Sequence, residues 1–265
     1  MNTQATQPKI AVIFDVNLLI DAVDPQSAFK DFAQRSLSGE NSAQQLFVSD
    51  TMLTTLAHRL HELGADINAV DEYVEFLLGT NEWGADIHLV RDVPKKSYPD
   101  LLDKFGKPDR EDETVVALRD TVEFGSGLPV VLVTNDRPLA TWCRGHARTA
   151  IQPNDMAKIV GSSFDSTKRS TLEYIARRMF ADGNTPPSVH LRRDQFADRL
   201  APLLREAEAN RKALAAENEP AAMFDFALPA APAAPKPTIA KPSPSPTRRL
   251  IVEPDPPAAG DEMEF

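Results

Sequence analysis

Three aspartates that are far apart in the sequence occupy positions from which carboxylates can reach a shared pocket. Asp15 ends the apolar run KIAVIF, Asp136 follows the run LPVVLVTN, and Asp112 lies in the acidic first turn of a helix expected over 109–125. Converging carboxylates supply hard oxygen ligands for a divalent cation, which can activate water and stabilise charge on a phosphate. Any one of these acids is equally typical of a turn or a helix cap. The occurrence of all three indicates metal-dependent nuclease chemistry.

The elements expected around these acids alternate between short strands and helices. Apolar runs predict strands over 9–14, 46–49, 87–90, 128–136 and 149–151. Helical spacing, caps and terminal glycines predict helical segments over 16–38, 50–63, 67–79, 109–125, 139–147 and 155–160. This alternation predicts an α/β domain over residues 9–162, with a central, mostly parallel sheet flanked by helices. Ligands of such sheets bind at the carboxyl ends of the strands, so Asp15 and Asp136 should face one crevice.

The motifs around the three aspartates resemble those of the PIN-domain family of metal-dependent ribonucleases. The opening, middle and closing motifs of that family are similar to VIFDVNLLIDA, DETVVALR and LPVVLVTNDRPL in this chain. The resemblance implies that Asp15, Asp112 and Asp136 bind Mg²⁺ or Mn²⁺ and carry catalysis. It also implies that Asn17 orients the first aspartate and that Thr134 supports the site from the end of its strand.

The chain departs from the family pattern at one acid in particular. The family places a Glu about six residues after a Ser at the second strand, and counting from Ser49 gives Thr55, which cannot supply a negative ligand. Pro138 also stands where a second acid is usual after Asp136, and Asp21 is a further acid near the expected pocket. Two hypotheses follow. One is a divalent-metal-dependent endoribonuclease, and the other is a PIN-like fold with weakened catalysis that acts as a regulatory or protein- or RNA-interaction module.

Other enzyme classes fit the sequence less well. A phosphatase of the haloacid-dehalogenase type also begins with a strand and an Asp, but it needs a second Asp where this chain has Asn17. The glycine-rich phosphate loops GxGxxG and GxxxxGK[ST] and the nucleophile elbow GxSxG do not occur. PIN proteins of about this size resemble bacterial toxins, which implies RNA as the substrate, an antitoxin or other protein partner, and a homodimer.

Beyond the expected nuclease domain, residues 163–219 predict a helical extension. Two helices with mixed charge are expected there, over 170–180 and 193–217. We expect a solvated extension that packs or dimerises, in preference to an arm that contacts RNA. Residues 1–8 are expected to form a flexible N-terminus.

Residues 220–265 are predicted to be a disordered tail. Half of the 22 prolines lie at or after Pro220, in a stretch rich in Ala, Pro and Ser that cannot bury enough apolar surface to offset ordering entropy. The tail ends in GDEMEF, an acidic-aromatic end similar to the tips with which bacterial single-stranded-DNA-binding proteins recruit partners. An ordinary solvated terminus is the simpler interpretation.

The charge and composition narrow the remaining function classes. The formal net charge is −10, and residues 1–165 hold 15 Lys and Arg against 25 Asp and Glu. Such an acidic domain is a poor nonspecific nucleic-acid binder, but it suits an enzyme whose acids surround a metal. No apolar window reaches the roughly 18 residues of a membrane span, and the single Cys143 excludes an internal disulfide. These features predict a cytoplasmic protein that does not enter the membrane.

Overall fold

The structure is a computed structural model, and its described residues belong to one compact unit of the chain. These residues are 10–39, 44–79, 84–85, 87–103, 106–107, 109–158, 165–181 and 191–217. The predicted flexible N-terminus (1–8) and the predicted tail (220–265) lie outside the described residues.

The described strands form one five-stranded, wholly parallel sheet in the order β3-β2-β1-β4-β5. Their bounds are β1 Ile10–Phe14, β2 Gln44–Ser49, β3 Ile87–Val90, β4 Val130–Val133 and β5 Ala150–Ile151. In the central strand, Val12 lies opposite Leu46 on one side and Val131 on the other. That strand is buried on both faces, which explains why its sequence is continuously apolar instead of alternating. The predicted α/β class with a parallel sheet is confirmed.

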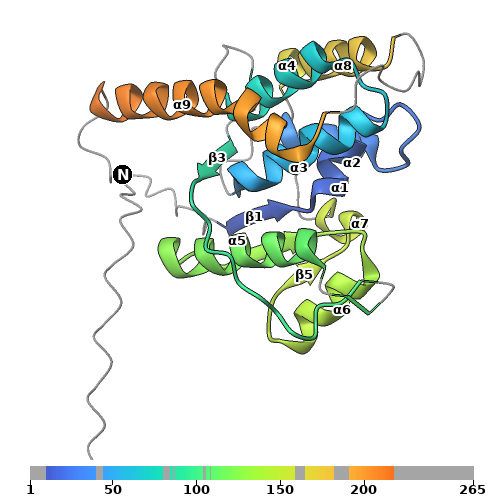
Figure 1. Ribbon diagram of the computed structural model, residues 1–265, viewed down its shortest axis with the longest axis vertical. Helices are drawn as coiled ribbons and strands as arrows, with labels where there is room; N and C mark the ends of the chain where they lie inside the picture. The colour runs from blue at the N-terminus through green and yellow to red at the C-terminus, as the bar shows by residue number, and fades with distance from the viewer. Residues whose placement is uncertain are drawn as a thin grey trace, which may run out of the picture. The chain divides into compact units, whose positions relative to one another are not determined.

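The crossover helices cover both faces of the sheet. The path from β1 through β2 to β3 contains α1 Val16–Asp21, α2 Lys30–Leu37, α3 Asp50–Glu62 and α4 Ile67–Leu78. The path then returns past β1, and α5 Arg110–Ser126 leads into β4. Because parallel crossovers are right-handed, a reversal of direction moves the helices to the opposite face. Figure 1 shows α3 and α4 on one side of β1 and α5 on the other. The remaining helices of this part are α6 Arg137–Gly145 and α7 Pro153–Met156.

The reversal puts a topological switch point between β1 and β4. These two strands are neighbours, but the chain leaves β1 toward β2 and leaves β4 toward β5, which lie on opposite sides in the sheet. In open α/β sheets, the crevice at such a point is the usual ligand site. The residues that directly follow β1 and β4 are therefore the ones to inspect for chemistry.

The helical extension packs against the sheet domain. Helix α8 (Ser166–Met179) contacts α4 and α2, and helix α9 (Arg193–Glu217) contacts α3 and α4. One stripe of α9 is buried, formed by Phe196, Leu200, Leu204 and Ala207. These helices thus pack against the domain, as the sequence predicted. Only their outer faces are solvated. The boundary predicted at 162–163 lies outside the described residues. No helix within the described ranges has the length and apolarity to cross a bilayer.

Two predicted helix boundaries were wrong, for identifiable reasons. The helix expected to stop before Gly125 continues through that residue to Ser126, and it ends at Gly127. Gly127 has φ +64°, a left-handed conformation that a residue without a side chain adopts without strain, so it is the true C-terminal stop. The helical segment expected over 16–38 is two helices, separated by a turn region over 22–29 that contains Pro25.

Candidate active site

Asp15 lies directly after β1, at the switch point, and is held from two sides. Its side chain is 2% exposed. The Thr134 hydroxyl donates to Asp15 Oδ2 at 2.7 Å, while the backbone N–H and the side-chain amide of Asn17 make longer contacts of 3.4 Å. Burial raises the pKa of Asp15 to about 6, and the hydrogen bonds from Thr134 and Asn17 oppose that rise. The carboxyl is therefore fixed in orientation and costly to ionise.

Asp136 begins helix α6 on the neighbouring strand connection. Its backbone N–H donates to Thr134 Oγ1 at 2.9 Å, so a single hydroxyl links Asp15 and Asp136. Asp136 Oδ1 accepts from the N–H of Leu139 at 2.8 Å and caps the helix, with Pro138 in the first turn. Capping and ligation are compatible, because a carboxylate has a second oxygen.

Asp21 also approaches this crevice. Its carboxylate accepts from Ser27 Oγ at 2.7 Å and from Asn135 Nδ2 at 3.2 Å. Asn135 lies in the bend between β4 and α6, and its side-chain amide links that bend to Asp21 at the end of α1. The amide oxygen of Asn135 is buried and has no hydrogen-bond partner in the described part of the chain. An oxygen acceptor with no donor beside several acids is a setting that suits a water molecule or a cation.

Asp112 enters the crevice from the N-terminus of α5. Asp109 caps that helix by accepting from the N–H groups of Glu111 and Asp112, both at 3.1 Å, and this cap sets which acids turn toward the sheet. The pKa of Asp112 rises to about 8, first through burial and then through the negative charges of Asp109, Asp15, Asp136 and Glu111. The three predicted acids thus come from three separate elements and influence one another electrostatically.

One cation stands at the border of the cluster. Arg59 Nη2 donates to Glu111 Oε2 at 3.0 Å, and this pairing raises the pKa of Arg59. Arg59 is on α3 and Glu111 on α5, so the pair joins helices that belong to opposite faces of the sheet. It neutralises Glu111 and leaves Asp15 and Asp112 without an ion-pair partner among the described residues.

Thr55, where the resemblance to the PIN family would expect an acid, is buried and contacts an arginine. Its hydroxyl donates to the carbonyl of Thr51 at 2.9 Å and accepts a hydrogen bond from Arg193 on α9. A positively charged group therefore lies where the family pattern has a negative one. Arg193 is 138 positions away in sequence, and no local pattern marked it.

The donor chemistry fits a hard divalent cation. Asp15, Asp112 and Asp136 offer carboxylate oxygens, the raised pKa values of the first two reflect uncompensated burial and negative charge, and the Asn135 oxygen has no donor. Among the described residues, however, no three His, Cys, Asp or Glu side chains already form a group of metal ligands. Joint binding of one ion would require these side chains to turn toward it.

Comparisons with protein-family models, with curated proteins and with solved structures find no match to this chain.

Sequence reasoning missed Asp109, Asn135 and Arg193. Asp109 could have been found, because an Asp three residues before Asp112 is an N-cap signal that sets the phase of the helix. Asn135 could not be separated from an ordinary turn residue without the position of Asp21. The contact of Arg193 with Thr55 depends wholly on how α9 packs against α3, so no local sequence pattern could have predicted it.

Proposed function

We propose that this chain is a divalent-metal-dependent nuclease that hydrolyses phosphodiester bonds in RNA, with the carboxylates of Asp15, Asp112 and Asp136 as the core of its active site. The observation that carries the proposal is the convergence of acids at the switch point: one Thr134 hydroxyl links Asp15 to Asp136, and the negative charges of both act on the buried carboxyl of Asp112, which together with burial raises its pKa to about 8. A buried cluster of like charges is costly to fold, and such clusters concentrate at functional sites.

The roles of the residues follow from their contacts. Thr134 and Asn17 hold the carboxylate of Asp15, and Asp136 keeps one oxygen on its helix cap and has the other available. Among the described residues, the carboxylates of Asp15 and Asp136 accept hydrogen bonds, whereas that of Asp112 has neither a hydrogen bond nor an ion pair, so it is the least constrained of the three. Mg²⁺ or Mn²⁺, when bound, lowers the pKa of a water molecule and stabilises negative charge on the phosphate.

The weakened-site alternative, a PIN-like interaction module, has its own supporting observation. Thr55 replaces an acid and contacts Arg193, which would oppose a second cation nearby. This favours a one-metal site within the proposed function. It would favour the interaction module if no cation binds at all. An antitoxin or other protein partner, a homodimer and a cytoplasmic setting stay predictions.

The test is cleavage of end-labelled single-stranded RNA by the purified chain with Mn²⁺, Mg²⁺ or EDTA. Asp15→Asn is the site variant, and Asp155→Asn is the matched control, because Asp155 is an exposed acid paired with Lys158 on α7. We expect metal-dependent cutting that Asp15→Asn abolishes and Asp155→Asn retains. Absence of cutting, together with absence of Mn²⁺ binding by titration calorimetry, would reject the nuclease in favour of the interaction module.

A further inference from the structure

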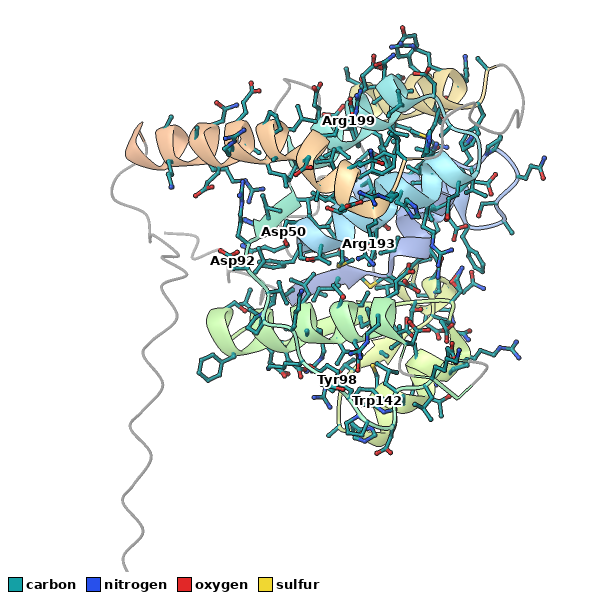
Figure 2. All side chains as sticks on the ribbon, viewed as in Figure 1. Asp50, Asp92, Tyr98, Trp142, Arg193 and Arg199 are labelled. Carbon is teal, nitrogen blue, oxygen red and sulfur yellow. The ribbon has the colours of Figure 1, made fainter. Side chains whose placement is uncertain are left out.

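A groove opens beside the acid cluster, along the carboxyl ends of β2 and β3. Its volume is about 790 Å³. The start of α3, the segment after β3, one face of α5 and one face of α9 line it, with charged side chains from Asp50, Arg91, Lys95, Lys96, Arg110, Glu113, Arg193 and Asp194. Figure 2 labels Asp50, at the start of α3, and Arg193, at the start of α9, both above α5 in that view. Glu113 directly follows Asp112 on α5, so the groove and the proposed active site share the first turn of that helix.

The acids of the groove are already bound by neighbouring groups. Glu113 accepts from Arg110 at 2.7 Å, from Ser97 at 3.1 Å and from the N–H of Tyr98 at 3.0 Å, and together these hydrogen bonds outweigh burial and lower its pKa. Asp194 is paired with Arg192 at 2.9 Å, and Asp50 Oδ1 accepts from the N–H of Thr51 at 2.7 Å. Glu113 and Asp194 are therefore paired with arginines, and Asp50 keeps its negative charge.

Of the five cations that line the groove, Arg110 and Arg91 form ion pairs with Glu113 and Glu208, whereas the other three have no acidic partner among the described residues. Lys95 and Lys96 are exposed and have no ion-pair partner within the described ranges. Two nitrogens of Arg91, Nε and Nη2, are buried without a hydrogen-bond partner, and the nearest ion-pair contact of Arg91 is Glu208 at 3.6 Å. Arg193 donates to the neutral Thr55 hydroxyl. In a chain of net charge −10, this is a local concentration of available positive charge.

We propose that this groove binds the phosphates of a single RNA strand and leads that strand to the acid cluster, with α9 as one wall. The inference rests on the proposed function for its substrate class. The volume is that of a pocket for a small ligand or a few nucleotides and is too small for a duplex. The described side chains that line it include no aromatic ring for base stacking, so binding is expected to be sensitive to salt and nearly independent of base sequence.

Two arginines of α9 make a matched pair for this inference. Arg193 faces the groove and contacts only a neutral hydroxyl among the described residues, whereas Arg199 forms an ion pair with Asp71 of α4. Both are labelled on the same helix in Figure 2. The phosphate role belongs to Arg193 alone, because the charge of Arg199 is already compensated.

The first test measures binding without cleavage, by fluorescence anisotropy of a labelled single-stranded RNA with the full chain in EDTA. The variant is Lys95→Ala/Lys96→Ala, and the control is Lys168→Ala/Arg177→Ala, which removes the same charge from α8 outside the groove. We expect roughly tenfold weaker binding for the groove variant and a salt slope smaller by about 1.4, since each phosphate contact on a single strand contributes about 0.7. The control should bind like the original chain. Equal binding by all three proteins would overturn the proposal.

The second test compares Arg193→Ala with Arg199→Ala in the same assay, each checked for unchanged circular dichroism. We expect weaker binding for Arg193→Ala and a binding constant within about twofold of the original for Arg199→Ala. Equal losses for both would mean that α9 contributes only through packing and would remove it from the binding surface.

A competing occupant is an acidic peptide, including the chain's own end PPAAGDEMEF. If that peptide binds in a manner that depends on Lys95 and Lys96 while RNA does not, the RNA assignment of the groove is wrong. The proposed function can fail separately. If RNA binding in EDTA depends on the groove but no metal-dependent cutting occurs, the groove proposal stands and the nuclease proposal is rejected. If metal-dependent cutting occurs and Lys95→Ala/Lys96→Ala does not change it, the nuclease proposal stands and the groove proposal is rejected.

Discussion

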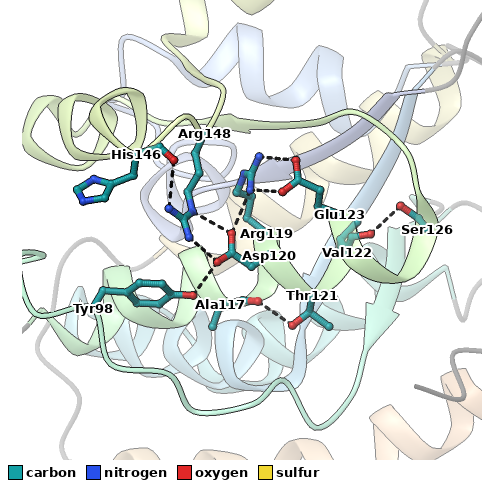
Figure 3. Close-up of polar contacts among 10 residues, drawn as sticks. All are labelled: Tyr98, Ala117, Arg119, Asp120, Thr121, Val122, Glu123, Ser126, His146 and Arg148. Atoms are coloured by element: carbon teal, nitrogen blue, oxygen red, sulfur yellow. Dashed lines mark hydrogen bonds and ion pairs between the residues drawn. The ribbon is translucent and has the colours of Figure 1, made fainter. Parts of the chain in front are cut away.

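Helix α5 carries two aspartates about two turns apart, Asp112 and Asp120, in opposite electrostatic settings. Asp120 accepts from Arg148 at 2.9 and 2.7 Å, from Arg119 at 3.0 Å and from the Tyr98 hydroxyl at 3.0 Å (Figure 3). Burial alone would raise the pKa of Asp120, but the hydrogen bonds from Arg148 and Arg119 outweigh it and lower that pKa. Arg148 also lies over the rings of Tyr98 and Trp142, so the cluster ties α5 to α6 and to the segment before α5.

Asp112 has the same residue type on the same helix, yet its neighbours are acids. Burial and the charges of Asp109, Asp15 and Asp136 raise its pKa to about 8. Ionised Asp112 lowers the stability of the metal-free chain, and a bound cation would compensate that charge. Asp120 needs no cation, because arginines already compensate its charge. The charges of the neighbouring side chains therefore distinguish a candidate catalytic acid from a structural one. Residue type and position on the helix do not.

The largest expected effect separates these two acids by activity. Asp112→Asn should lower metal-dependent RNA cleavage at least about 100-fold, because it removes a charged ligand from the site. Asp120→Asn should leave the rate per folded molecule close to that of the original chain. Initial rates with Mn²⁺, corrected for the folded fraction, measure both. Equal losses in the two variants would break the comparison.

Stability should show the opposite order. Asp120→Asn leaves Arg148 without its carboxylate and removes one of the two acids that Arg119 binds, the other being Glu123, so it should cost about 3 kcal/mol in the free energy of unfolding. Asp112→Asn should instead stabilise the metal-free chain at pH 8 by about 1 kcal/mol, since it removes a poorly compensated charge. Urea unfolding in EDTA tests both signs. A destabilised Asp112→Asn variant would show that Asp112 has a structural partner.

The pH dependence of stability should follow from the two raised pKa values. In the unfolded chain both carboxyls have a pKa of 3.8 and release their protons above that pH. In the folded chain Asp15 keeps its proton up to about pH 6 and Asp112 up to about pH 8. The stability that these two protonated carboxyls contribute is therefore fully present below pH 3.8. It is lost as the pH rises through their pKa values in the folded chain. In EDTA, the original chain should lose about 2 kcal/mol more between pH 5 and pH 8 than Asp15→Asn/Asp112→Asn, after a discount for solvent screening. Parallel curves for the two proteins would contradict the assignment, and Mn²⁺ should flatten the curve of the original chain alone.

Much of the fold was predictable because it is encoded locally. The strand over 87–90 and the helix over 193–217 have the predicted bounds, and Ser49 caps α3 by accepting from the N–H of Met52. Apolar runs, caps and helical spacing depend on near neighbours in sequence, so they are legible without a structure. The stop at Gly127 was missed because two glycines competed and only backbone geometry distinguishes them.

The site was predictable only in part, for a physical reason. Asp15 and Asp136 follow from strand ends, because parallel strands bring their carboxyl ends to one edge. The raised pKa of Asp112, the position of Arg193 beside Thr55 and the groove along α9 depend on tertiary packing between distant segments. No periodicity in a single sequence reports which charges are left without partners after such packing.

The smallest expected effect concerns the missing acid. Thr55→Glu would place a carboxylate where the PIN-family resemblance expects one, but Arg193 already contacts that position and would pair with the new charge. We therefore expect less than about a threefold change in the cleavage rate, because a charge that is neutralised by an arginine adds little to cation binding. Thr55→Gln is the matched control for size, and Thr55→Glu/Arg193→Ala removes the neutralising partner. If Thr55→Glu alone raises the rate more than about tenfold, Arg193 does not shield the position, and the lost acid, rather than the arrangement of the remaining three, limits the site.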